Sequence, residues 1–123
     1  MSWVTAAIGN ASDKVDIRVG VGALIAVGEC AQEPVPFDLL LAGLGACTAI
    51  TLKQFAAARN WPLEAVEVDL NIVSRQRSVF VERILSIKGP LTCDQREALL
   101  AASDKTPATL LLRPGLRIHT ELA

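Results

Sequence analysis

The stretch "PFDLLLAGLGACTAITLKQFAAARN", residues 36–60, decides the fold, because it is a long and largely apolar run that no proline interrupts after Pro36. Proline suits the first helical position, where its missing N–H is not needed. Asp38 in the first turn favours the positive end of the helix dipole. Pro62 then stops the helix, so we predict about 23 helical residues, roughly 35 Å long. The first half is apolar on every side, which is typical of a buried helix.

Small residues mark the middle of this predicted helix. Gly43 and Gly45 stand among alanines, although a helix interior disfavours glycine by roughly 1 kcal/mol relative to alanine. They predict that another backbone or strand packs very close. Cys47 follows them. From the residues alone it is either a buried, inert small side chain or a thiol whose thiolate form is a nucleophile.

Strands are predicted on both sides of the helix. Residues 15–21 alternate apolar and polar side chains, the period of a half-buried strand, and residues 65–73 alternate in the same way. The full set of predicted strands is 2–8, 15–21 and 23–27 before the helix, and 65–73, 79–87 and 116–122 after it. Residues 15–27 are predicted to form one hairpin, and residues 74–78 the tip of a second.

A second helix is predicted from a capping box in which Thr92 is the N-cap and Gln95 stands three residues on. It should run from about residue 93 to 104, with Leu99 and Leu100 inward. A break at residues 106–108 then precedes the last strand. The predicted order is β-β-β-α-β-β-α-β, an α+β fold in a single domain of residues 1–123.

Composition excludes several classes of protein. The formal net charge is −1 and the basic residues are scattered, which argues against nucleic acid or an anionic membrane as partner. Residues 1–9 lack the pattern of a secretory signal, and residues 39–52, the most apolar stretch, are followed by Lys53. We therefore expect no membrane span. Three cysteines without a CxxC pair, and one histidine, predict a reduced cytoplasmic protein with no metal site and no cofactor.

A chain of 123 residues with short strands cannot easily enclose a long helix that is apolar all round. We therefore predict a homodimer in which the two central helices are covered jointly and strands are exchanged between chains. The alternative is a monomer with an apolar groove.

Three blocks of sequence together resemble a known family. "PVPFDLLLAGLGACTAITLKQFAAARNWPLEAVEVDLNI" resembles the central helix and following strand of the OsmC/Ohr family of thiol-dependent peroxidases. "ERILSIKGPLTCDQREALLAASDKTP" resembles its later strand and helix, and "LRIHTEL" its closing strand. The likeness covers residues 15–122 and is strongest to the general OsmC-like branch. It implies an intertwined homodimer.

The resemblance also implies a mechanism. In the family, a cysteine of the central helix attacks a hydroperoxide and becomes a sulfenic acid, a second cysteine condenses with it, and a dithiol restores both. The first position matches Cys47, but the second is Thr106, which cannot form a disulfide. Cys93, at a helix N-terminus that favours a thiolate, and Cys30, in the loop before the central helix, are the alternatives for this step.

The remaining site residues follow from the same comparison. The family's acidic residue matches Phe37, with Asp38 next to it, and its arginine has no match, although Arg18 lies on the following strand. The residues predicted to line the pocket are Arg18, Asp38, Leu44, Thr51 and Thr106.

We expect thiol-dependent reduction of small organic hydroperoxides, an antioxidant stress response, with an external thiol as reductant. The alternative is a non-catalytic dimer that binds a small apolar or thiol-containing ligand.

Overall fold

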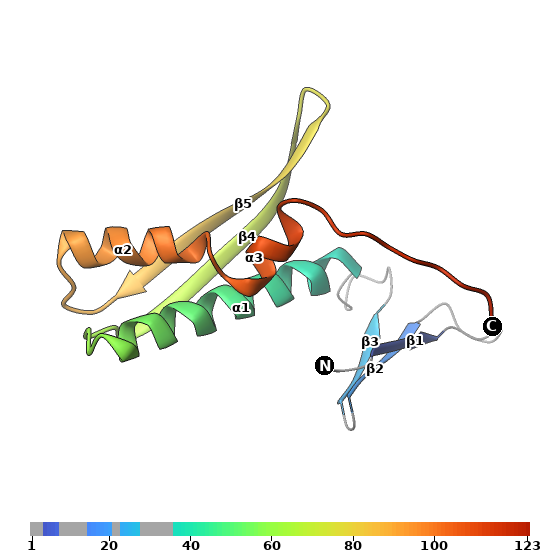
Figure 1. Cartoon of the computed structure of the whole chain (residues 1–123), viewed down its shortest axis with the longest axis horizontal. Coiled ribbons are helices and arrows are strands. Elements are labelled where there is room, and N and C mark those ends of the chain that lie inside the picture. The colour runs from blue at the N-terminus through green and yellow to red at the C-terminus, as the bar shows by residue number, and fades with distance from the viewer. Residues whose placement is uncertain (1–3, 8–14, 21–22, 28–35) are drawn as a thin grey trace. The chain divides into compact units, whose positions relative to one another are not determined.

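The computed structural model describes residues 4–7, 15–20, 23–27 and 36–123. The chain divides into two compact units, Met1–Leu40 and Leu41–Ala123, and each is described by itself. Figure 1 shows the elements in chain order, from the strands coloured blue to the helices coloured orange and red.

The first unit holds a three-stranded antiparallel sheet in the order β1-β2-β3. Its strands are β1 (Val4–Ala7), β2 (Val15–Val19) and β3 (Ala23–Val27). Along β2 half-buried residues alternate with exposed ones, which confirms the predicted period. Strands β2 and β3 pair antiparallel, as the predicted hairpin requires. Residues 2, 3, 8, 21 and 22, at the ends of the predicted strands and in their turn, lie outside the described residues.

Helix α1 (Pro36–Ala58) begins at the predicted residue. Its C-terminus is closed by a left-handed residue, Asn60, with φ of 56°. Trp61 N–H donates to the Ala56 carbonyl over 2.9 Å, and Asn60 N–H donates to the Ala57 carbonyl over 3.2 Å. This pair of bonds is a Schellman motif, which satisfies carbonyls that the helix itself leaves free.

Only one stripe of α1 is buried within the chain: Gly45, Thr48, Leu52 and Ala56. One chain therefore does not cover this helix on every side, since Leu40 is 49% and Ile50 57% exposed, and its joint burial in a dimer stays a prediction. The prediction of a close neighbour holds at Gly45, where a Cβ atom would lie 2.8 Å from Leu70 Cδ1, and not at Gly43, where nothing lies within 4 Å.

By length and composition α1 is also able to cross a membrane, with a mean hydropathy of 1.5, although the core helix of a soluble protein passes the same test. The expectation that no stretch is apolar enough is wrong on these two criteria. The reason is that one charged residue, Lys53, does not prevent an 18-residue stretch of α1 from being apolar on average.

Strands β4 (Ala65–Arg75) and β5 (Ser78–Lys88) form a long two-stranded hairpin. Their antiparallel register pairs Val66 with Ile87 and Leu70 with Arg83. The turn residues Gln76 and Arg77 both have positive φ, 46° and 72°, as in a type I′ turn. The hairpin tip is therefore two residues long rather than the predicted five.

Helix α2 (Cys93–Ser103) has the predicted capping box. Gln95 N–H donates to Thr92 Oγ1 over 3.1 Å, and Thr92 N–H donates to Gln95 Oε1 over 3.0 Å. Leu99 is fully buried as predicted, whereas Leu100 is 58% exposed. The prediction for Leu100 is wrong because it lies about 100° further round the helix than Leu99.

The chain after α2 differs most from the prediction. A short helix, α3 (Pro107–Leu112), begins inside the break predicted at residues 106–108, and residues 113–123 form no strand. The predicted strand at 116–122 is therefore wrong for a single chain, since a strand needs a neighbour to pair with. The segment is exposed, and within it His119 Nε2 lies 2.9 Å from Glu121 Oε1. The histidine thus has an acidic partner two residues along the same segment.

The second unit has two layers, the β4–β5 hairpin and the helices packed on one of its faces. Leu52 and Ala56 of α1 and Leu99 and Ala102 of α2 form the buried core. The strand residues that pack against this core come from one face of the hairpin: Val66, Leu85 and Ile87. Helices α1 and α2 run in opposite directions over it (Figure 1).

Candidate functional site

Cys47 lies on the flank of α1, between its buried stripe and its exposed side. It is half-buried and carries a free thiol. Each helical residue turns the chain by about 100°, so Cys47 stands about 100° from the buried Thr48 and further from Leu52. This placement leaves the thiol neither sealed in the core nor fully in solvent.

Two of the predicted pocket residues lie beside Cys47. Leu44 and Thr51 are three and four residues away on the same helix, which puts all three side chains on one flank, and both are half-buried. Asp38 belongs to the first turn of α1 and is exposed. It is nine residues from Cys47, about 13 Å along the helix axis. Arg18 is exposed on β2, in the other unit.

The structure does not bring Cys93 to Cys47. Cys93 is exposed at the first position of α2, and Ser103 ends that helix about 15 Å away. Arg83 links the Ser103 end of α2 to Thr48, the neighbour of Cys47. The other end of α2 points away from Cys47, because Leu99 packs near Leu52 and Ala56, further along α1. A disulfide needs Cα atoms roughly 4.4–6.8 Å apart, so these two thiols cannot pair within one chain. Cys30 lies outside the described residues.

The main polar feature of the second unit is Arg83, whose side chain is 13% exposed. Its Nη1 donates to Thr48 Oγ1 over 3.0 Å and to Thr109 Oγ1 over 2.8 Å. Its Nη2 donates to the Ser103 carbonyl over 2.9 Å and to Asp104 Oδ1 over 3.4 Å. One guanidinium of β5 therefore joins α1, the end of α2 and α3.

Thr106 belongs to the same network. It is fully buried, and as the N-cap of α3 its hydroxyl accepts from Thr109 N–H over 3.2 Å. The hydroxyls of Thr106 and Thr109 lie 2.7 Å apart and share a hydrogen bond. The position that the resemblance assigns to a second cysteine is thus used to begin a helix, and Thr109 and Arg83 connect it to Thr48, the neighbour of Cys47.

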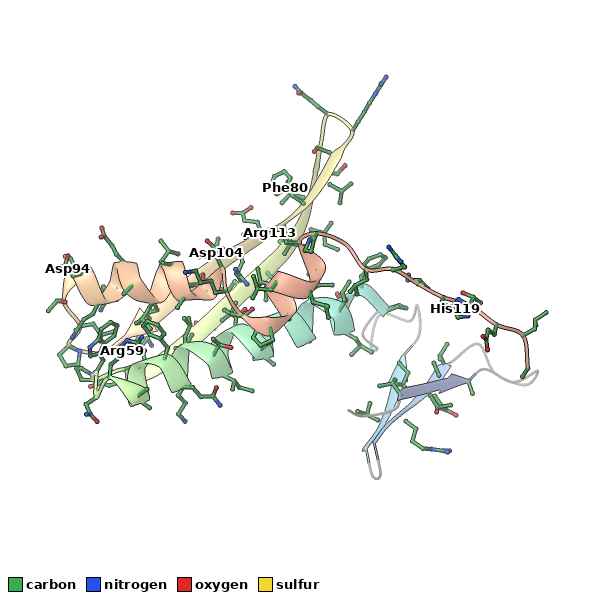
Figure 2. All side chains as sticks on the ribbon, in the orientation of Figure 1. Arg59, Phe80, Asp94, Asp104, Arg113 and His119 are labelled. Carbon is green, nitrogen blue, oxygen red and sulfur yellow. The ribbon has the colours of Figure 1, made fainter. Side chains whose placement is uncertain are left out.

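Asp104 closes the network on its solvent side. Its carboxylate lies 3.1 Å from Arg113 Nη2 as well as 3.4 Å from Arg83 Nη2. Figure 2 shows Asp104 and Arg113 close together where α2 ends and α3 ends. Both of these side chains are more than half exposed, so this outer ion pair contributes little to stability.

Sequence reasoning missed Arg83. The signal was present, because the residues alternating from Val79 through Val81, Leu85 and Ile87 place a charged side chain on the apolar face of that strand. A cation in the middle of an apolar face needs buried acceptors, and the threonines and the end of α2 supply them.

No metal-binding group stands out in the part of the chain that the structure describes, where no three His, Cys, Asp or Glu side chains gather. A small hollow is lined by the side chains of Asp69, Asn71, Glu82 and Ile84 and also by Leu70. Those four side chains lie on the face of the hairpin opposite Arg83, so the hollow is separate from the Cys47 flank.

The model of the OsmC-like protein family matches residues 28–121. The chain belongs to this family. No curated protein matches this OsmC-like chain. An OsmC-like protein from Mycoplasma pneumoniae has a similar structure, with a TM-score of 0.78 and 18% identity over 92% of this chain and 87% of that one.

Two further solved structures are of proteins named for organic hydroperoxide resistance. An organic hydroperoxide resistance protein OsmC from Legionella pneumophila gives a TM-score of 0.64 at 18% identity, over 89% of this chain and 87% of that one. The organic hydroperoxide resistance protein OhrB of Bacillus subtilis gives 0.62 at 19% identity, over 89% and 88%. At these identities the likeness shows the α+β OsmC-like fold alone.

Proposed function

We propose that this OsmC-like protein reduces small organic hydroperoxides with Cys47 as the reactive thiol. The observation that carries the proposal is the placement of Cys47, half-buried on the flank of α1 in a chain of this family. Two structural neighbours are named as organic hydroperoxide resistance proteins, which supports the same chemistry. The apolar residues on the flank, Leu44 and the exposed Ile50, suit the organic part of such a substrate.

The first step is attack by the Cys47 thiolate on one oxygen of the hydroperoxide. A sulfur–oxygen bond forms, the oxygen–oxygen bond breaks, and the alcohol leaves after taking a proton. The cysteine becomes a sulfenic acid and is oxidised by two electrons, while the hydroperoxide is reduced by two.

An external thiol completes the cycle. The sulfur of that thiol attacks the sulfenic sulfur, water leaves, and a mixed disulfide forms. A second external thiol then releases Cys47 as the free thiol, and the two external thiols leave as their disulfide. Within the described residues of one chain no internal partner lies near Cys47, because Thr106 has no sulfur and Cys93 lies at the far end of α2. Cys30, outside the described residues, stays the internal alternative to an external thiol. The flank of α1 gives an external thiol a route to Cys47.

The fate of Thr106 also supports a second candidate, a non-catalytic dimer that binds a small apolar or thiol-containing ligand beside Cys47. The Thr106 hydroxyl caps α3 and shares a hydrogen bond with the Thr109 hydroxyl, so this position has no redox role. Binding without turnover would need only the half-buried flank.

The dimer predicted from the sequence is part of both proposals. Within the described residues each of β4 and β5 is paired on one side only, and an exposed strand edge is a template for another chain. The segment 116–122 alternates apolar and polar residues and is exposed, with Ile118 at 85% and Leu122 at 101%. A second copy would cover the apolar side of α1 that one chain leaves open.

Peroxide consumption tests the proposal. Purified protein is mixed with cumene hydroperoxide and a small thiol, and peroxide loss is followed for wild type, Cys47→Ser and Cys93→Ser. The proposal predicts loss with wild type and with Cys93→Ser, and none above the buffer rate with Cys47→Ser. If wild type consumes peroxide no faster than buffer and a small ligand stays bound to the purified protein, the result would favour the non-catalytic binding dimer.

A further inference from the structure

The buried stripe of α1 offers few features that hold the helix at one rotation. Three of its four residues, Gly45, Leu52 and Ala56, are apolar, and apolar contacts are not directional. Gly45 admits Leu70 closely but makes no directional bond to it. Thr48 is the polar member of the stripe, and a hydrogen bond does depend on direction.

Thr48 is bonded on both sides. Its hydroxyl donates to the Leu44 carbonyl over 2.7 Å and accepts from Arg83 Nη1 over 3.0 Å. The first bond fixes the threonine rotamer against its own helix. The second ties that fixed side chain to β5. A rotation of α1 by even part of a residue would break the second bond.

Arg83 is itself held in place by the other elements. Its Nη2 donates to the Ser103 carbonyl and its Nη1 to Thr109, which are 2.9 and 2.8 Å away. The last turn of α2 has no basic residue of its own, so Arg83 also supplies the positive charge that the negative end of this helix favours. The guanidinium is therefore a fixed point against which α1 is set.

We propose that the Arg83–Thr48 hydrogen bond fixes the rotation of α1 and thereby holds Cys47 on its half-buried flank. Arg83 and Thr48 are positioning residues that act through the helix and need not touch a substrate. The inference rests on the proposed function only where it says that the position of Cys47 matters for catalysis. The position itself is measured without any turnover.

Two flanks of α1 make the test specific. Cys47 and Ala49 are the neighbours of Thr48 in the chain, both are half-buried, and they lie about 100° to either side of it. A rotation of the helix exposes one flank and buries the other. A general loosening of the unit exposes both. Opposite changes at positions 47 and 49 therefore identify a rotation.

The experiment measures the rate at which a single cysteine reacts with dithiobis(nitrobenzoate) in the native protein. One background carries Cys30→Ser and Cys93→Ser, so that only Cys47 reacts. The other adds Cys47→Ser and Ala49→Cys. Thr48→Val removes the hydroxyl at constant shape and Thr48→Ser retains it, and both are placed in each background.

With Thr48→Val we expect the two labelling rates to change in opposite directions. Each should change by about tenfold, the factor that corresponds to ~1.4 kcal/mol for one hydrogen bond. Thr48→Ser should label like the parent in both backgrounds. Arg83→Lys, which cannot reproduce the planar fork, should repeat the Thr48→Val result, and it is the second variant should the valine protein not fold.

Arg113→Met is the matched control, since it removes an arginine from Asp104 and leaves the bonds of Arg83 to Thr48 in place. Its labelling rates should equal those of the parent. Unchanged rates in Thr48→Val, or rates that rise together at both positions, would overturn the inference. Because no peroxide is used, these outcomes are independent of whether Cys47 proves to be catalytic.

Discussion

Replacement of Arg83 by methionine should destabilise the protein more than the same replacement at an exposed arginine such as Arg113. Methionine retains the apolar stem but removes the Arg83 donor from three buried acceptors: Thr48 Oγ1, Thr109 Oγ1 and the Ser103 carbonyl, the last of which keeps a long bond of 3.4 Å from Thr109 Oγ1. Each lost hydrogen bond lowers the free energy of unfolding by about 1 kcal/mol, because the threonine hydroxyls can partly replace it with bonds to one another. The total loss is therefore about 3 kcal/mol. Asp104 is 58% exposed and adds little.

The assay is urea and thermal unfolding followed by far-ultraviolet circular dichroism at one protein concentration. For a chain of this size, 3 kcal/mol corresponds to a fall in Tm of about 12 °C. Arg113→Met, which removes a contact between two exposed side chains, should change the free energy of unfolding by less than about 0.5 kcal/mol. Equal losses in the two variants, or a loss below about 1 kcal/mol for Arg83→Met, would refute this account of the network.

Four further substitutions test the local structure by the same unfolding assay. Gly89→Ala should cost more than about 2 kcal/mol, because φ is +139° there and the new Cβ would collide with the Pro62 carbonyl oxygen, and a loss under about 1 kcal/mol would contradict that geometry. Thr92→Ala should cost about 1 kcal/mol by removing the α2 cap, whereas a neutral result would mean that the cap is not used. Gly43→Ala should raise the free energy of unfolding by up to about 1 kcal/mol, because the new Cβ would lie in open space. Gly45→Ala should not, since its Cβ would meet the Leu70 methyl group. The reverse order would be inconsistent with the packing of α1.

The elements that follow from local chemistry were predictable from the sequence. Pro36 fixed the start of α1, and Thr92 with Gln95 fixed the start of α2, because caps and the first proline act on their own neighbours. The alternation along residues 65–73 predicted β4, since period two is a property of one strand. The periodicity of α1 predicted that Leu44 and Thr51 lie beside Cys47, whereas the role that the family resemblance implies for Cys47 stays a prediction.

Features that depend on partners distant in the chain were not predictable. Residues 116–122 have the pattern of a strand, but a strand exists only where another one pairs with it. Leu100 was assigned to the core from its apolar character, although its direction is set by where α2 rests on the hairpin. The role of Arg83 needed the fold, because its acceptors come from three elements that are 20 to 35 residues away.

The central claim is that Cys47 is the thiol that hydroperoxide oxidises, and trapping of its sulfenic acid tests this most directly. Protein treated with one equivalent of cumene hydroperoxide in the presence of dimedone is digested, and its three cysteine peptides are compared by mass spectrometry. The account predicts the dimedone adduct on the Cys47 peptide, and its loss in Cys47→Ser. An unmodified Cys47 peptide after complete consumption of the hydroperoxide would contradict it.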